Sequence, residues 1–220
     1  MKFPNAYTGV KKLFVAELMA IVAALVMFFS AILAAVGATN DALLVTAGTL
    51  VLISSIALII AYIVQLVGLH QAGKDEAQIR TAFIFMIVGL ILGVVSAILS
   101  NFTSTYGLNL VVGLIDAGKT GVEVCAAYYT LLGIATLASR VNNEKMAKEG
   151  RTLSIFVIVF FALQIVLNLY PKFIGSGAPE WLIALVNITA IIAALAKLVV
   201  YIVTFIYYYK ATRMLEKYSL

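Results

Sequence analysis

Charged residues are scarce in this sequence. Only 11% of the 220 residues are charged and 64% are hydrophobic, whereas a soluble domain usually has about a quarter of its residues charged. This shortage argues against an ordinary soluble fold, because too few polar side chains are present to cover a surface that faces water. The composition instead indicates a protein whose surface faces lipid.

Cysteine and histidine are nearly absent, with Cys125 and His70 as the single examples. One cysteine excludes a disulfide within the chain, and one cysteine with one histidine is too small a set for a structural metal site. The sequence also lacks the nucleophile and metalloprotease motifs that mark membrane enzymes. We therefore predict no metal, no cofactor and no enzymatic activity.

Long apolar runs predict an all-α, polytopic membrane bundle of six transmembrane helices, because about 20 apolar residues cross the hydrocarbon core of a bilayer. The polar segments between the runs are too short to bury a second core, so we expect one domain over residues 1–220. Asp75, three residues before Gln78, predicts a helix start, and Gly150 predicts the end of an extension of the fourth helix. The predicted spans are 12–37, 42–70, 80–100, 108–139, 152–170 and 180–210.

Lysine and arginine gather in the loops on one side of these spans. By the positive-inside rule, this distribution places both termini in the cytoplasm of a multi-pass protein of the cell (plasma) membrane. It also argues against a nucleic-acid partner, because the net charge of +5 follows the membrane boundary. Lys172 alone falls on the other side, and the cytoplasmic group comprises Lys2, Lys11, Lys12, Lys74, Arg80, Arg140, Lys145, Lys148, Arg151, Lys210, Arg213 and Lys217.

A weaker pattern suggests an internal repeat. The second, fourth and sixth runs look longer than the others, and each carries a tyrosine late in the span before a basic end. This pattern predicts three pseudo-repeated helical hairpins, as found in transport folds. The alternative is that any chain of six helices gives three hairpins. The tyrosines are Tyr62, Tyr128 and Tyr201.

Small residues at four-residue spacing predict close helix packing, because they let two helix backbones approach each other. One such stripe lies in the span at 80–100 and a second in the span at 12–37. The stripes are Gly89, Gly93 and Ala97, and Ala16, Ala20 and Ala24.

Charged residues lie deep inside two of the predicted spans. Asp116, Lys119 and Glu123 share one face of the span at 108–139, and Lys197 lies at a similar depth in the last span. A charge at the centre of a bilayer costs about 2.5–3.5 kcal/mol, so these side chains must face one another, water or a ligand. Amides on the last two spans add polarity to the same region: Gln164, Asn168 and Asn187.

Two interpretations of these charges stay open. In the functional one, they line a cavity between the last three spans and bind or pass a small polar solute or ion. In the structural one, Glu123 pairs with Lys197 and ties two helices together. Glu17 lies nearer the boundary of the first span, where we expect it to reach the headgroups or a neighbouring lysine.

A string that matches the Walker A motif lies in the fourth predicted span, from Gly113 to Thr120. That motif acts through a strand, a phosphate-binding loop and a helix in a soluble α/β sheet. An apolar membrane span offers no such context, so we do not predict nucleotide binding.

Transport or channel activity fits these features best, with the lipid bilayer and a small polar solute or ion as partners. A non-catalytic membrane assembly or regulatory subunit is the alternative, and it would bind other membrane subunits or a second copy of the chain. In topology and size the chain also resembles the substrate-binding membrane subunits of energy-coupling-factor transporters, whose first helix carries alanines at four-residue spacing. The stripe of Ala16, Ala20 and Ala24 matches that feature. The resemblance implies a substrate-binding subunit of a larger transporter.

Overall fold

A computed structural model describes residues 2–36, 40–101, 106–174 and 180–219. Within these ranges it describes the backbone alone for residues 106–110, 160, 163–174, 180–188 and 190–198. These residues form six α-helices and no strand. Four of the helices are long and apolar enough to cross a membrane: α1, α2, α3 and the part of α4 from Val111 to Arg140. The helices are α1 (Pro4–Val36), α2 (Asp41–Ala72), α3 (Ala77–Ser100), α4 (Tyr106–Arg140), α5 (Glu144–Ile174) and α6 (Glu180–Glu216).

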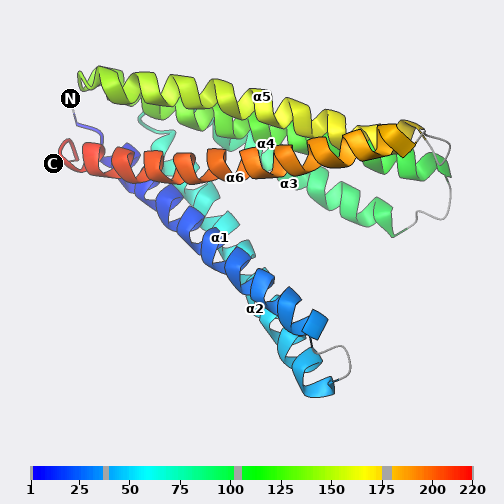
Figure 1. Ribbon diagram of the computed structural model, residues 1–220. Helices are drawn as coiled ribbons and strands as arrows, with labels where there is room; N and C mark the ends of the chain where they lie inside the picture. Colours follow the sequence, from blue (N-terminus) through cyan, green and yellow to red (C-terminus); the bar gives the residue numbers. More distant parts are fainter. Residues whose placement is uncertain (1, 37–39, 102–105, 175–179, 220) are drawn as a thin grey trace.

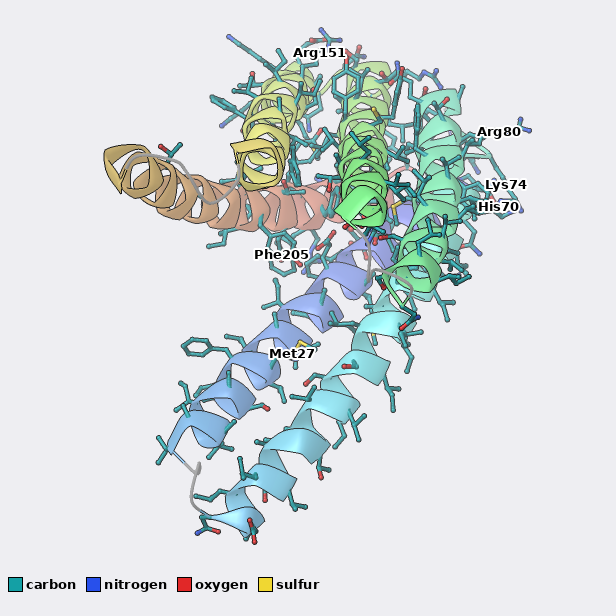
Figure 2. All side chains as sticks on the ribbon, turned by 90° about the vertical axis from the view of Figure 1, so that its right-hand side faces the viewer. Met27, His70, Lys74, Arg80, Arg151 and Phe205 are labelled. Atoms are coloured by element: carbon teal, nitrogen blue, oxygen red, sulfur yellow. The ribbon has the colours of Figure 1, made fainter. Side chains whose placement is uncertain are left out.

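The six helices meet at one end of the molecule and separate into two groups toward the other (Figure 1). Helices α3, α4 and α5 lie side by side, and α6 runs at an angle to them and contacts α1 and α5 (Figure 2). Helices α1 and α2 form a hairpin that diverges from the others toward its connecting loop (Figures 1 and 2). We call the shared end, which also holds both termini, the vertex. Its buried core takes Phe3 and residues from 6–13 of α1, 69–86 of α2 and α3, 124–157 of α4 and α5, and 200–215 of α6.

The hairpin of α1 and α2 is held by small residues that recur every seven positions on each helix. Gly9 lies against the backbone of Gly68 at the vertex. Near the far end, the hydroxyl of Ser30 donates a hydrogen bond of 2.8 Å to the carbonyl oxygen of Ala47. These two anchors share one antiparallel register, which keeps the small faces together along the whole hairpin. The buried small residues are Gly9, Ala16, Ala23 and Ser30 on α1 and Ala47, Ser54, Ala61 and Gly68 on α2.

The predicted alanine stripe on the first helix is therefore wrong in its spacing. Ala16 is buried, but Ala20 is only partly buried and Ala24 is exposed. The seven-residue spacing prevails because two helices that wrap around each other keep in contact those residues that recur every 3.5 positions on average. Ala16 thus packs inside the hairpin and is not free to dock another protein.

Two adjacent acids in the turn between α2 and α3 tie the helices together at the vertex. The carboxylate of Asp75 accepts hydrogen bonds from the backbone N–H of Ala6 at 2.7 Å and from the side chain of Asn5 at 2.9 Å, which caps the start of α1. Glu76 is buried and forms an ion pair of 2.9 Å with Arg140 at the end of α4. The turn therefore connects α1, α2, α3 and α4 through polar contacts.

The predicted role of Asp75 as the start signal of the third helix is corrected by these contacts. Glu76 is the N-cap of α3, and its side chain accepts from the backbone N–H of Gln78 at 3.4 Å. The sequence alone favoured Asp75 because local spacing cannot show that the start of α1, about 70 residues away in the chain, takes the carboxylate.

Gly150 does not end the fourth helix, as the sequence suggested. Helix α4 ends at Arg140, and the backbone of Asn142 in the following turn is left-handed, with φ of 57°. The side chain of Asn143 then accepts from the backbone N–H of Met146 at 3.2 Å and begins α5. Gly150 instead lies within α5, at a position where a side chain would collide with the hydroxyl of Tyr207.

The close approach of α1 and α2 predicts that Gly9→Ala destabilises the hairpin. An added methyl group would lie 2.5 Å from the carbonyl oxygen of Gly68 and from the backbone nitrogen of Ala72, neither of which can move without shifting a helix. We expect a loss of about 1–3 kcal/mol in the free energy of unfolding, measured by denaturation in detergent. Gly48→Ala is the control, because nothing lies within 4 Å of an added methyl there. Equal losses in both variants would contradict the register.

The ion pair at the vertex predicts that Arg140→Met destabilises the protein, because it leaves Glu76 unpaired where only 4% of its side chain is exposed. We expect a loss of about 2–3 kcal/mol in the free energy of unfolding, somewhat below the cost for a fully buried pair because 42% of the Arg140 side chain is exposed. Arg213→Met removes a pair with Glu216 in which both side chains are more than half exposed, and should change stability by less than about 1 kcal/mol. A similar loss in both variants would argue against the connecting role of the turn.

Candidate functional site

A cavity of about 360 Å³ lies beside the vertex, and all six helices contribute to its wall. Apolar residues from α3, α4 and α5, such as Met86, Leu131 and Val157, form part of the lining. The polar lining residues are Glu17 of α1, Tyr62 and Gln65 of α2, Glu123 and Thr130 of α4, and Tyr201, Thr204 and Tyr208 of α6.

The cavity is acidic. Among the described residues that line it, Glu17 and Glu123 carry charge, and no lysine or arginine is present. Carboxylates that face a cavity between membrane helices attract cations and proton donors. The arrangement therefore suits a positively charged or hydrogen-bond-donating guest.

Aromatic packing between α1 and α6 positions one of the two acids. The ring of Phe14 stacks on Phe205, with 5.0 Å between the ring centroids. About one helical turn away, the hydroxyl of Tyr201 donates a hydrogen bond of 3.4 Å to the backbone carbonyl oxygen of Glu17. Because the aromatic pair fixes the register of the two helices, Glu17 and Tyr201 reach the cavity together.

A second tyrosine is fixed on the opposite wall. The hydroxyl of Tyr62 on α2 donates to the carbonyl oxygen of Met86 on α3 at 2.9 Å. Tyr62 and Glu123 also line a second hollow of about 570 Å³ that lies between α2, α3 and α4. These two side chains therefore lie at the boundary between the cavity and the second hollow.

The charged face of α4 packs against the small residues of α3. The hydroxyl of Ser96 donates to the carboxylate of Asp116 at 2.5 Å. The side chain of Lys119 lies over Gly93, and the side chain of Glu123 lies over Gly89. The predicted stripe of small residues on the third helix thus makes room for charged side chains of its neighbour.

This packing corrects the predicted direction of two charges. The sequence placed Asp116 and Lys119 between the last three helices, but the structure directs them toward α3. Glu123 contacts α3 as well, yet it also lines the cavity that α5 and α6 help to form. The glycines explain the difference, because Gly89 and Gly93 leave space on α3 for the side chains of Glu123 and Lys119.

Lys119 and Glu123 form an ion pair of 3.8 Å within α4, in which 41% and 46% of the side chains are exposed. Such an exposed pair contributes little to stability in water. The predicted pair between Glu123 and Lys197 stays a prediction, because the side chain of Lys197 lies outside the described residues. The same holds for the side chains of Gln164, Asn168 and Asn187, whose backbones belong to α5 and α6.

Glu17 lines the cavity, a role that sequence reasoning did not predict. We expected it at the membrane boundary because the first span was predicted to begin near residue 12. Helix α1 begins at Pro4, so Glu17 lies about 20 Å along the helix axis from its start. The missed signal was the proline at the first helical position, which is a common start residue.

The string from Gly113 to Thr120 lies within the continuous helix α4. Its backbone N–H groups are therefore used in helical hydrogen bonds and cannot form a phosphate-binding loop. This context agrees with the interpretation that the string is a chance match.

Comparisons with protein-family models, with curated proteins and with solved structures found no match.

Proposed function

We propose that this chain is a polytopic membrane protein of the transport or channel type, which binds or passes a small cationic or polar solute through the cavity beside the vertex. In this proposal α5 and α6 complete a six-span bundle with α1 to α4. The lysines and arginines near the vertex face the cytoplasm, and the cell (plasma) membrane is the location that this topology favours.

The acidic cavity is the observation that carries the proposal. Glu17 and Glu123 place two carboxyl groups in its wall, and the described lining residues include no lysine or arginine. Ionisable side chains among membrane helices are costly and are kept where they face water, a partner charge or a ligand. A cationic guest would provide a partner charge for Glu17, since Glu123 already pairs with Lys119 at 3.8 Å.

Size and aromatic content narrow the class of guest. A volume of about 360 Å³ is at the lower end of the range for ligand pockets, which suits an ion with a few waters or a small organic ammonium. Tyr62, Tyr201 and Tyr208 line the same space, and the faces of aromatic rings attract cations.

The arrangement of the helices also supports transport. The cavity is lined both by the α1–α2 hairpin and by the other helices, and these two groups diverge from the vertex (Figure 1). A tilt of the hairpin would therefore change access to the cavity. Movement of one group of helices against another around a fixed site is the usual mechanism of secondary transporters.

An assembly or regulatory subunit is the second candidate, and the half-exposed pair of Lys119 and Glu123 favours it. These charges line a hollow beside the glycine stripe of α3, where a polar helix from another membrane subunit or a second copy would cover them. The third candidate, a substrate-binding subunit of a larger transporter, loses its main support because Ala16 is buried within the hairpin.

Ligand-dependent stabilisation of the purified protein in neutral detergent tests the transport proposal. We expect inorganic or small organic cations to raise the unfolding temperature, since a ligand at 100 times its Kd stabilises by about 2.7 kcal/mol. Glu17→Gln and Glu123→Gln should each weaken that response by at least about ten-fold in apparent Kd, because each removes one of two charges that attract the cation. Uptake of the best ligand into liposomes then distinguishes transport from binding.

Glu216→Gln provides the control, because this acid lies at the end of α6 and pairs with Arg213 away from the cavity. Its ligand response should equal that of the unmodified chain. If the cavity variants lose stability but keep the same ligand response as the control, the acids are structural and the transport proposal fails.

A further inference from the structure

A separate pocket of about 350 Å³ lies outside the bundle, between the end of α2 and the start of α3. It is lined by His70, Gly73, Lys74, Arg80, Phe83 and Ile84. Figure 2 shows that His70, Lys74 and Arg80 lie together at the outer edge of these helices, on the side away from α5. None of these residues contributes to the acidic cavity.

At the turn between α2 and α3, the acidic and the basic side chains lie on different sides. Its two acids point into the protein, where Asp75 caps α1 and Glu76 pairs with Arg140. Its bases line the pocket, and within the described part of the chain no carboxylate comes within 4.0 Å of Lys74 or Arg80. The pocket therefore presents positive charge that the neighbouring acids do not neutralise.

The basic cluster by the α5–α6 surface differs in this respect. Lys145, Lys148 and Lys210 line a hollow there, but Glu149 lies among them and pairs with Lys210 at 2.9 Å. Several neighbouring lysines therefore do not by themselves create a site of unneutralised positive charge. The pocket beside α3 stands apart because its lining includes no acid.

The floor and the outer side of the pocket are apolar. The imidazole of His70 lies against the ring of Phe83, with 5.3 Å between the ring centroids. Ile84 is 56% exposed, and Val88 and Ile91 continue an exposed apolar strip along the face of α3 that begins at Arg80. A basic recess thus opens directly onto a surface suited to acyl chains.

We propose that this pocket binds the phosphate headgroup of an anionic phospholipid, with Lys74 and Arg80 on the phosphate and the acyl chains along α3. Clusters of basic residues beside membrane helices attract anionic headgroups by about 1 kcal/mol for each charge near the surface. The N-terminal end of α3 adds a favourable dipole next to the phosphate. The apolar strip favours a lipid over free phosphate, which would leave the strip unused.

Lipid bound here would also stabilise the vertex, because the same turn holds Asp75 and Glu76 in their contacts with α1 and α4. The inference does not rest on the transport function. It requires only that the apolar helices lie in a bilayer with the α2–α3 turn at its surface.

Lipid binding to the purified full-length chain tests the inference, with native mass spectrometry and thermal unfolding in neutral detergent as readouts. Three additions are compared: phosphatidylglycerol, phosphatidylcholine and inorganic phosphate. We expect phosphatidylglycerol to bind and stabilise at concentrations where phosphatidylcholine and phosphate have no effect. The double variant Lys74→Gln with Arg80→Gln should weaken phosphatidylglycerol binding by roughly 30-fold, which corresponds to the loss of about 1 kcal/mol for each of two charges.

Matched variants separate this site from a general charge effect. Lys2→Gln with Lys217→Gln removes the same charge elsewhere near the vertex, and its binding should remain unchanged. Lys74→Arg with Arg80→Lys keeps both charges and should bind as the unmodified chain does, which also shows that the pocket tolerates substitution.

Three outcomes would overturn the inference. Equal binding of the two phospholipids would remove the role of charge, and an equal loss in the Lys2 and Lys217 variant would remove the role of this pocket. Binding of inorganic phosphate in competition with phosphatidylglycerol at equal concentration would identify a free-anion site instead of a lipid site.

Discussion

The turn between α2 and α3 is the constraint on which the arrangement of this protein depends. Two consecutive acids there take different partners, since Asp75 caps the start of α1 and Glu76 pairs with Arg140 at the end of α4. Without these contacts, the hairpin would meet the other helices mainly through apolar surfaces, which offer little directional preference. These polar contacts and the ring pair of Phe14 and Phe205 together fix the relative placement of the two groups of helices.

The placement of the helices in turn creates the acidic cavity. Helices that diverge from a common end cannot remain in contact along their whole length, so space opens just beyond the packed core. Glu17 and Glu123 line that space from helices of the two different groups. The divergence of the helices thus opens the cavity, and Glu17 and Glu123 make it acidic.

The helical nature of the chain could be predicted from composition and the lengths of the apolar runs, because lipid exposure leaves a strong signal in both. Of the six predicted spans, four are confirmed as helices long and apolar enough to cross a membrane among the described residues. The shared face of Asp116, Lys119 and Glu123 also followed from helical periodicity. Periodicity did not predict which helix that face contacts, because the choice between α3 and the last helices depends on where glycines leave room. Gly89 and Gly93 carried that information, but the sequence does not show which helix they oppose.

Other features could not be predicted because they depend on contacts that are distant in the chain. The pairing of Gly9 with Gly68, and the capping of α1 by Asp75, each join residues far apart in sequence. Their local patterns also fit other roles, which is why the four-residue alanine stripe and the start at Asp75 were plausible. A search for small residues at seven-residue spacing on both of the first two runs would have found the hairpin register.

The tight packing of the α1–α2 hairpin has a mechanical consequence. Small residues hold the two helices together from Gly9 to the hydrogen bond between Ser30 and Ala47, so the hairpin moves as a stiff unit. With 33 residues in α1, this unit is about 50 Å long, and a rotation of about 5° at its base would displace its tip by about 4 Å. A small rotation of the hairpin near the cavity would therefore produce a larger displacement at its opposite end.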